Sequence, residues 1–105
     1  MIRTTLNLQP KNANQSEVIR YFVEKRVLER SSRTLGFISA ELYASMDNSS
    51  MLVTATWQDQ NSYQRWVSDP WRAKSSEALS QLLDQELNAK TKGSIFQFIH
   101  GVPGR

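Results

Sequence analysis

The residues with the clearest chemical potential lie in one short stretch, TATWQDQNSYQRWVSDPWR, at residues 54–72. It holds all three tryptophans of the chain and one tyrosine, here called the aromatic cluster: Trp57, Tyr63, Trp66 and Trp71. Such rings serve mainly for burial, but they also form the walls of pockets for flat ligands. The cluster therefore either packs one corner of a core or lines a binding site, and the pattern alone leaves both readings open.

The sequence lacks the residues that most other kinds of catalytic or binding site need. The chain has one histidine, His100, and no cysteine, which disfavours His- or Cys-based metal sites, nucleophilic triads and thiol chemistry. The 4 glycines form neither a phosphate loop nor a dinucleotide fingerprint. We interpret the scattered carboxylates as helix caps and solvated helix faces: Asp59, Asp69, Glu77 and Asp84. No metal site is expected.

Composition indicates a single small globular domain. The 105 residues are 39% hydrophobic, with few glycines and prolines, and we place the domain at residues 1–100 with a tail at 101–105. The net charge of +3 is mild, and the densest run of cations, Lys25, Arg26, Arg30 and Arg33, falls at the end of the first expected helix. Cations complement the helix dipole there, so we predict a solvated helix end and no nucleic-acid partner.

The cellular location of the protein is predicted from features that the sequence lacks. Absence of cysteine agrees with a reducing compartment, and no apolar stretch approaches the length that spans a membrane. The chain does not open with a basic start followed by an apolar run, as a secretory leader would. We therefore expect a cytoplasmic protein with no membrane partner.

Hydrophobic periodicity predicts the elements that must position the aromatic cluster. Alternation predicts strands at residues 2–9, 37–45, 51–57 and 94–100. Asn14 with Glu17 resembles a capping box before an amphipathic helix that runs through Leu28. Asp59 is expected to cap a short helix through Val67, and Asp69-Pro70 to start a longer one that ends near Lys90–Gly93.

This order, β-α-β-β-α-β, predicts an α+β fold of the ferredoxin-like split βαβ type. Helices cover one face of such a sheet, and the other face should be polar if it meets water. Strands two and four are instead apolar on both sides. In the second strand, Phe37 and Tyr43 are expected on one face and Ile38 and Leu42 on the other. In the fourth strand, Ile95 and Ile99 are expected on one face and Phe96 and Phe98 on the other. We therefore predict that an identical subunit covers the second face, giving a homodimer, and a ligand on that face is the alternative.

These residues also resemble a known family. Gly36-Phe37 followed by ISAELY, a hairpin that returns to Trp57, and then Tyr63, Trp66 and Asp69-Pro70 are similar to the antibiotic biosynthesis monooxygenase (ABM) domain. The best match runs from GFISAELYAS to WQDQNSYQRW, similar to the family patterns G-F-x(5)-Y/L and W-E-S-x-x-A-Y/F. The resemblance implies a dimeric α+β barrel, and its members include cofactor-free oxygenases and haem-degrading monooxygenases.

Within this resemblance, the cofactor-free oxygenases imply that Trp57 and Tyr63 are the catalytic residues. A functional Asn and a functional Tyr of those enzymes fall at Val53 and Leu42 here. Such an oxygenase must bind an electron-rich phenol, favour its phenolate and exclude water while dioxygen takes an electron. The donors for that anion would be the Trp57 N–H, the Tyr63 hydroxyl, and Arg72 or Arg65 if either points inward.

The haem-degrading members imply a second set of residues. Their signature Asn and Trp correspond to Asn7 and Trp66, although a small shift of the first strand would match Thr5 instead of Asn7. Their axial histidine corresponds to Ser75, and serine is not among the usual haem-iron ligands. The resemblance therefore favours a protein without a cofactor, with haem disfavoured by Ser75.

The sequence thus predicts a cofactor-independent monooxygenase for a small aromatic or polyketide-like substrate. A haem-binding or haem-degrading protein and a non-catalytic binding module of the same fold are the alternatives. In addition to Trp57 and Tyr63, we expect five ligand-binding residues: Asn7, Trp66, Trp71, Arg72 and Ser75.

Overall fold

The computed structural model describes residues 1–88 and 93–104. Its strands form one antiparallel sheet in the order β2-β3-β1-β4, with bounds β1 (Ile2–Leu8), β2 (Phe37–Ala44), β3 (Met51–Trp57) and β4 (Ser94–Gln97). The helices are η1 (Lys11–Ala13, a 3-10 turn), α1 (Gln15–Glu24), α2 (Val27–Ser31), α3 (Gln60–Val67), α4 (Pro70–Ser80) and α5 (Gln85–Asn88). This strand order confirms the predicted ferredoxin-like α+β fold.

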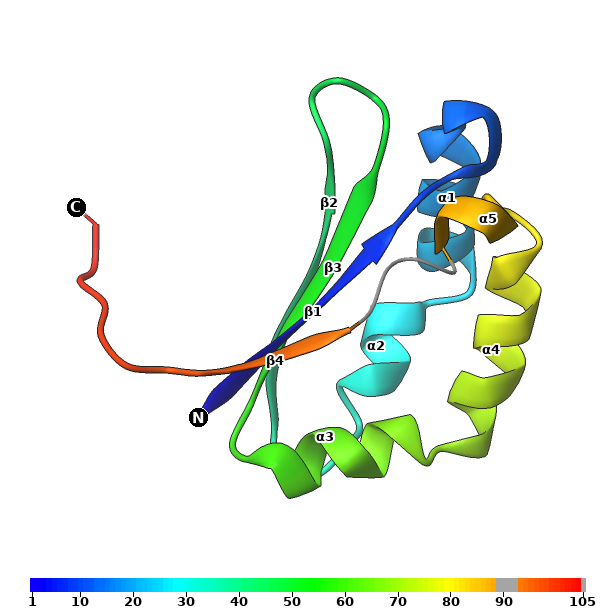
Figure 1. Cartoon of the computed structure of the whole chain (residues 1–105). Helices are drawn as coiled ribbons and strands as arrows, with labels where there is room; N and C mark the ends of the chain where they lie inside the picture. The colour runs from blue at the N-terminus through cyan, green and yellow to red at the C-terminus, as the bar shows by residue number, and fades with distance from the viewer. Residues whose placement is uncertain (89–92, 105) are drawn as a thin grey trace.

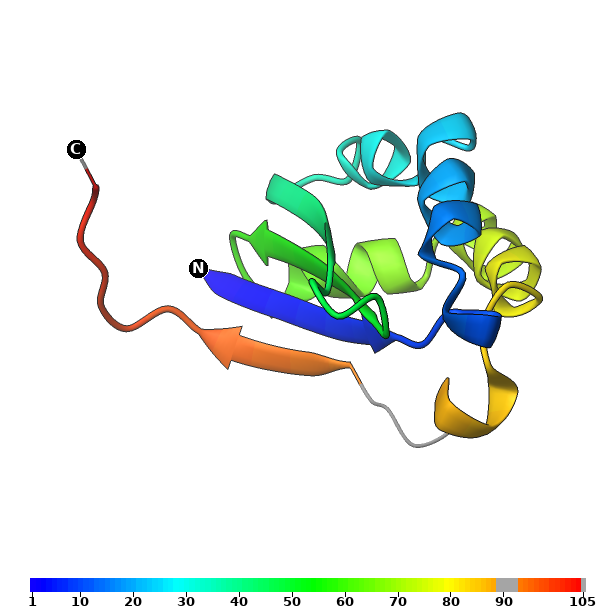
Figure 2. The ribbon, with the colours of Figure 1, turned by 90° about the horizontal axis from the view of Figure 1, so that it is seen from above.

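The helices lie on one side of the sheet, and α3 runs across the end where β3 finishes (Figures 1 and 2). Between the two layers lie two clusters of buried apolar residues. One contains Leu8, Val18, Phe22, Met51 and Leu83, and the other contains Ala55, Trp57 and Trp66. The aromatic cluster thus belongs to the second core at the α3 end of the sheet. Within the described residues, no helix combines the length and apolar character needed to cross a bilayer.

The first predicted helix is interrupted. It was expected to run through Leu28, but α1 ends at Glu24 and α2 begins at Val27. Arg26 between them has a left-handed backbone, with φ 53° and ψ 47°, which a continuous helix cannot include. The break turns Leu28 of α2 toward the first core cluster.

The helix predicted after Pro70 is also shorter than expected. Its α4 part ends at Ser80 because the following backbone pairs with the chain beyond β1. Lys11 N donates to Leu82 O at 2.9 Å, and Asp84 N donates to Gln9 O at 2.8 Å. Before this pairing the chain makes turn-type bonds, from Leu82 N to Leu79 O at 2.9 Å and from Leu83 N to Ser80 O at 3.2 Å, and helix resumes only as α5. The expected helix end at Lys90 and Lys92 falls outside the described residues.

The sheet corrects two further expectations. A β-bulge between Phe37 and Ser39 shifts the register of β2, so Phe37 and Ala40 pack in the core beside Trp57 while Tyr43 is exposed. Phe37 and Tyr43 were predicted on one face. The last strand ends at Gln97 rather than residue 100, because Gln97 pairs with Ile2, near the start of β1. After one further bond, from Phe98 N to Met1 O, the chain leaves the sheet (Figure 1).

Gly36 lies between α2 and β2, at a point where the chain passes close to α3. Its φ is +91°, and an added Cβ would lie 1.9 Å from Ser62 Oγ and 2.5 Å from Ser62 Cβ. Its carbonyl accepts a hydrogen bond from Gln58 N at 2.8 Å. A side chain here would both strain the backbone and push α3 away from the sheet.

We expect Gly36→Ala to lower the free energy of unfolding by on the order of 3 kcal/mol, because left-handed strain and overpacking add. Urea unfolding followed by tryptophan fluorescence measures the change. Gly104→Ala is the matched control, since nothing lies within 4 Å of a Cβ at that position. Equal stability of the two variants would contradict the close approach of Gly36 to Ser62.

Candidate functional site

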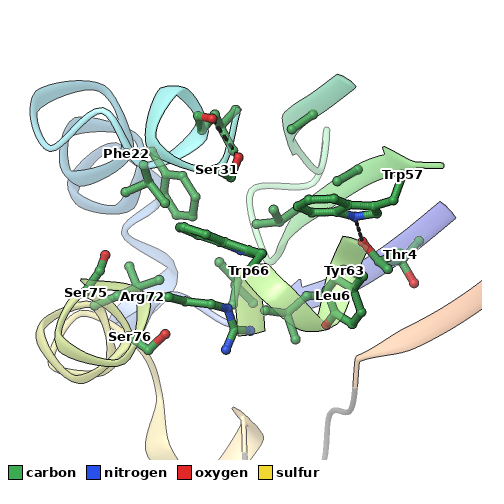
Figure 3. Close-up of a pocket in the computed structure, with 18 residues that line it drawn as sticks. Thr4, Leu6, Phe22, Ser31, Trp57, Tyr63, Trp66, Arg72, Ser75 and Ser76 are labelled. Carbon is green, nitrogen blue, oxygen red and sulfur yellow. Dashed lines mark hydrogen bonds between the residues drawn. The ribbon is translucent and has the colours of Figure 1, made fainter. Parts of the chain in front are cut away.

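A cavity lies between the sheet and helices α1 to α4, next to the aromatic cluster (Figure 3). It offers about 100 Å³ to water-sized molecules, on the scale of a cavity that holds one aromatic ring. Its lining is Thr4, Thr5, Leu6, Leu8, Phe22, Val27, Leu28, Ser31, Ala40, Val53, Ala55, Trp57, Tyr63, Trp66, Arg72, Ser75, Ser76 and Leu79. The wall is mainly aliphatic and aromatic, with a few hydroxyl groups and one charge.

Trp57 forms the end wall and is held rigidly. Only 1% of the residue is exposed, and its ring centre lies 5.4 Å from that of Phe37 and 5.7 Å from that of Tyr63. Its indole N–H donates to Thr4 Oγ1 at 3.2 Å (Figure 3). The N–H that we expected to serve a ligand is thus already used within the protein. The Thr4 hydroxyl, which accepts that bond, keeps its own proton for a further partner.

Helix α3 brings Tyr63 and Trp66 to the cavity. The Asp59 carboxylate caps α3 as predicted and accepts from both Ser62 N and Ser62 Oγ at 2.8 Å. The backbone bond from Ser62, followed by its side-chain bond, lowers the pKa of Asp59. The stability that this cap contributes is therefore present above the ordinary carboxyl pKa and is lost as pH falls through the lowered value.

The rings of α3 differ in burial. Trp66 is buried, whereas Tyr63 is half-buried and its hydroxyl makes no hydrogen bond to any residue that the structure describes. That hydroxyl is therefore available to a molecule in the cavity.

Among the lining residues that the structure describes, Arg72 supplies the only charge. It lies in the first turn of α4, which Pro70 opens and which Asp69 caps through a 2.8 Å bond from Trp71 N. Figure 3 shows its side chain reaching from α4 into the cavity below Trp66. Within residues 1–88 and 93–104, no carboxylate forms an ion pair with it. A half-buried cation without a counter-ion favours an anionic occupant.

Ser75 lines the cavity but is engaged elsewhere. Its hydroxyl lies 2.9 Å from the Tyr21 hydroxyl, which also donates to the Ser75 carbonyl at 3.0 Å. These contacts join α4 to α1 behind the cavity. Tyr21 was not singled out from the sequence, and its position in the amphipathic pattern of α1 gave no signal of this contact.

Three residues considered for the site lie elsewhere. Asn7 is exposed, and its neighbours on β1, Leu6 and Leu8, are the ones that line the cavity. Trp71 lies outside the lining and stacks against Trp66, with ring centres 6.1 Å apart. Arg65 points outward, and its guanidinium donates to Leu35 O at 3.2 Å.

Three hydroxyl residues that sequence reasoning missed do line the cavity. They are Thr4, Ser31 and Ser76, and only the alternation of the first strand hinted that Thr4 faces the helices. Among the described residues, no group of three or more His, Cys, Asp or Glu side chains could hold a metal ion.

The fold and site together define an α+β protein with a partly open, mainly apolar cavity of small-molecule size. The family model described as "Antibiotic biosynthesis monooxygenase" matches residues 1–78, and the chain belongs to this family. The match covers β1 through most of α4, including every residue that lines the cavity except Leu79. A comparison with curated proteins gives no match.

Solved structures share this fold. ActVA-Orf6 of Streptomyces coelicolor, a monooxygenase in complex with nanaomycin D, is 23% identical with a TM-score of 0.81, covering 99% of this chain and 92% of its own. A mutant of SnoaB, a cofactor-independent oxygenase from Streptomyces nogalater, is 19% identical with a TM-score of 0.80, covering 98% and 97%. Rv0793 from Mycobacterium tuberculosis is 11% identical with a TM-score of 0.78, covering 97% and 98%. At these identities the likeness shows the fold alone.

We expect Thr4→Val to lower the free energy of unfolding by about 1 to 3 kcal/mol, because it leaves the buried Trp57 N–H without an acceptor. Chemical denaturation measures this. Thr34→Val, the same change at a half-buried threonine outside the cavity lining, is the control and should be nearly neutral. If both changes are silent, the Thr4–Trp57 bond does not hold the cavity wall.

Proposed function

We propose that this protein is a cofactor-independent monooxygenase that acts on a small phenolic substrate of aromatic or polyketide-like type. The observation that carries the proposal is the unpaired Arg72 guanidinium in an otherwise apolar and aromatic cavity. An aromatic ring fits the walls, and an ionised phenol oxygen supplies the missing negative charge. The family membership and the fold shared with SnoaB and ActVA-Orf6 agree with this assignment.

The chemistry requires the substrate to provide its own electrons. An electron-rich phenol loses its hydroxyl proton, and the phenolate passes an electron to dioxygen. The resulting peroxide at the ring carbon then loses water to give a quinone. In balance, one phenol and one dioxygen give one quinone and one water, with the ring oxidised and oxygen reduced.

The protein contributes binding, charge and exclusion of water in this scheme. Arg72 lowers the energy of the phenolate relative to the phenol, because its positive charge stabilises only the ionised form. The Tyr63 hydroxyl donates a hydrogen bond to the same oxygen or to the developing peroxide. Trp57 and Trp66 keep water from the intermediate radical pair, and Thr4 offers a second hydroxyl at the Trp57 end.

We further infer that the cavity does not hold haem. Its described lining contains no His, Cys or Met, and Ser75, which corresponds to the expected axial ligand, shares its hydroxyl with Tyr21. Tyr63 is the one lining residue of a type that ligates haem iron, and we assign its hydroxyl to the phenolate. His100 lies beyond β4, beside Met1 and Phe98 and away from the cavity. No step of the proposed mechanism therefore involves haem.

A non-catalytic binding module remains the second candidate, because the apolar cavity with one cation would bind the same phenolates without turnover.

We further propose that the protein works as a homodimer joined through the sheet face opposite the helices. Phe96 and Tyr43 face away from the helical layer and are more than half exposed, at 55% and 53%. On the same face, the cross-strand neighbours Glu41 and Thr54 each have a buried side-chain oxygen without a hydrogen-bond partner. A second copy would cover the apolar rings and could bring donors to those oxygens.

We expect Arg72→Gln to lower kcat/KM for a dihydroxynaphthalene by roughly ten- to a hundredfold, the value of a charged hydrogen bond, and to move the rate profile to higher pH. Oxygen uptake and quinone absorbance measure this. Lys74→Gln is the control, because Lys74 is exposed on the same helix and outside the lining.

Tyr63→Phe should reduce the rate of this oxidation while leaving the free energy of unfolding nearly unchanged.

Two results would contradict this assignment. Equal kcat/KM for Arg72→Gln and the wild-type protein would remove Arg72 from phenolate binding. Tight, Arg72-dependent binding of the naphthol without oxygen uptake would favour the binding module over the enzyme.

We expect light scattering to give the mass of a dimer for the wild-type chain, and of a monomer for Phe96→Asp, because a buried carboxylate at the contact is costly. Val23→Asp is the control: Val23 is 66% exposed on α1, in the helical layer. A monomeric wild-type mass at micromolar concentration, or dissociation by both variants alike, would contradict the proposed face.

A further inference from the structure

The short helix α2 separates the cavity from a second hollow on its outer side. Its inner residues Val27, Leu28 and Ser31 line the cavity. Its outer side opens on a surface groove lined by Lys25, Arg26, Glu29, Arg30, Ser32, Arg33 and Trp71, here called the basic groove. Trp71 forms part of the groove and stacks on Trp66, which belongs to the cavity.

The basic groove carries an excess of positive charge. Four cations face a single carboxylate, and Arg26 Nε already pairs with Glu29 Oε2 at 3.7 Å. Lys25 and Arg33 form no ion pair with any described residue. The neighbouring hollow, which shares Arg30 and Arg33, adds one cation, Arg65, and one carboxylate, Asp69. Bringing like charges together is unfavourable unless an anion offsets their repulsion.

Two features orient the arginines of the groove. The Arg30 guanidinium carbon lies 5.5 Å from the Trp71 ring centre, so the aromatic face holds that planar group in place. Arg26 adopts a left-handed backbone, an uncommon and costly conformation for a residue other than glycine. Arginine held in this way presents paired N–H donors that match the oxygens of a phosphate.

The cations lie at helix ends, as the sequence predicted, but at the ends of two helices. Lys25 is the C-cap of α1, and Arg30 lies in the last turn of the short helix α2. They also converge on an aromatic residue from α4, about forty positions further along the chain.

We propose that the basic groove is a binding site for a small molecule with two or more adjacent negative charges, of the diphosphate or phosphate-ester class. The site is separate from the phenol cavity and does not depend on the proposed oxygenase activity. A compact ligand is favoured over a nucleic-acid strand, because the excess charge occupies one groove and the whole chain has a net charge of only +3.

The test is calorimetric titration of the full chain with inorganic pyrophosphate at low ionic strength. We expect binding with one site per chain that weakens as salt is raised. In a proton–nitrogen NMR spectrum, the indole signal of Trp71 should shift more than those of Trp57 and Trp66. Arg33→Gln and Lys25→Gln, both at exposed positions, should each weaken binding by roughly three- to tenfold.

Arg20→Gln is the matched control. It removes one cation from α1, outside the groove, where Arg20 pairs with Glu17 at 3.6 Å, and it should bind pyrophosphate like the wild-type chain. Absence of binding, or equal weakening in the control, would overturn the proposal. The proposal would also fail if phosphatidylglycerol vesicles or single-stranded DNA bound through Arg33 while pyrophosphate did not bind. The groove would then recognise a membrane surface or a nucleic-acid strand.

Discussion

The burial of Trp57 is the constraint on which the rest of this structure depends. It is the last residue of β3, and it pairs with Ile2 of β1 on one side and Phe37 of β2 on the other. Its N–H requires an acceptor in a nearly dry environment, and Thr4 provides it. Since a shift of β1 by one residue would turn Thr4 to the opposite face, this hydrogen bond favours one register for the sheet.

The start of α3 follows from the same corner. After Trp57 the chain has two residues in which to turn, and Asp59 caps the helix while Gly36 allows Ser62 to approach the sheet closely. Tyr63 and Trp66 then lie one turn apart on the inner side of α3. The cavity is thus the space left where a rigid indole prevents α3 and α4 from closing fully onto the sheet.

Charge is distributed unevenly around this frame. The cavity contains one cation, Arg72, whereas the basic groove outside α2 contains four. The two hollows are separated by one short helix and by the stacked rings of Trp66 and Trp71. Helix α2 has only five residues, and Arg26 before it has a left-handed backbone. A helix this short is not stable alone, so packing against its neighbours holds it in place more than its own helical hydrogen bonds do.

The sequence by itself determined the order of elements, the fold class, the caps at Asp59 and Asp69, and the grouping of Trp57, Tyr63 and Trp66, while it left Arg72 and Arg65 as alternatives for the cation. Those features depend on local chemistry: alternation, capping residues and proline positions act over a few neighbouring residues. Only the tertiary structure decided that the Trp57 N–H is used by Thr4, that Ser75 is bound to Tyr21, that Asn7 faces outward and that the cations around α2 converge on Trp71. These contacts join residues far apart in the chain, and such partners are chosen by packing geometry that no local pattern encodes.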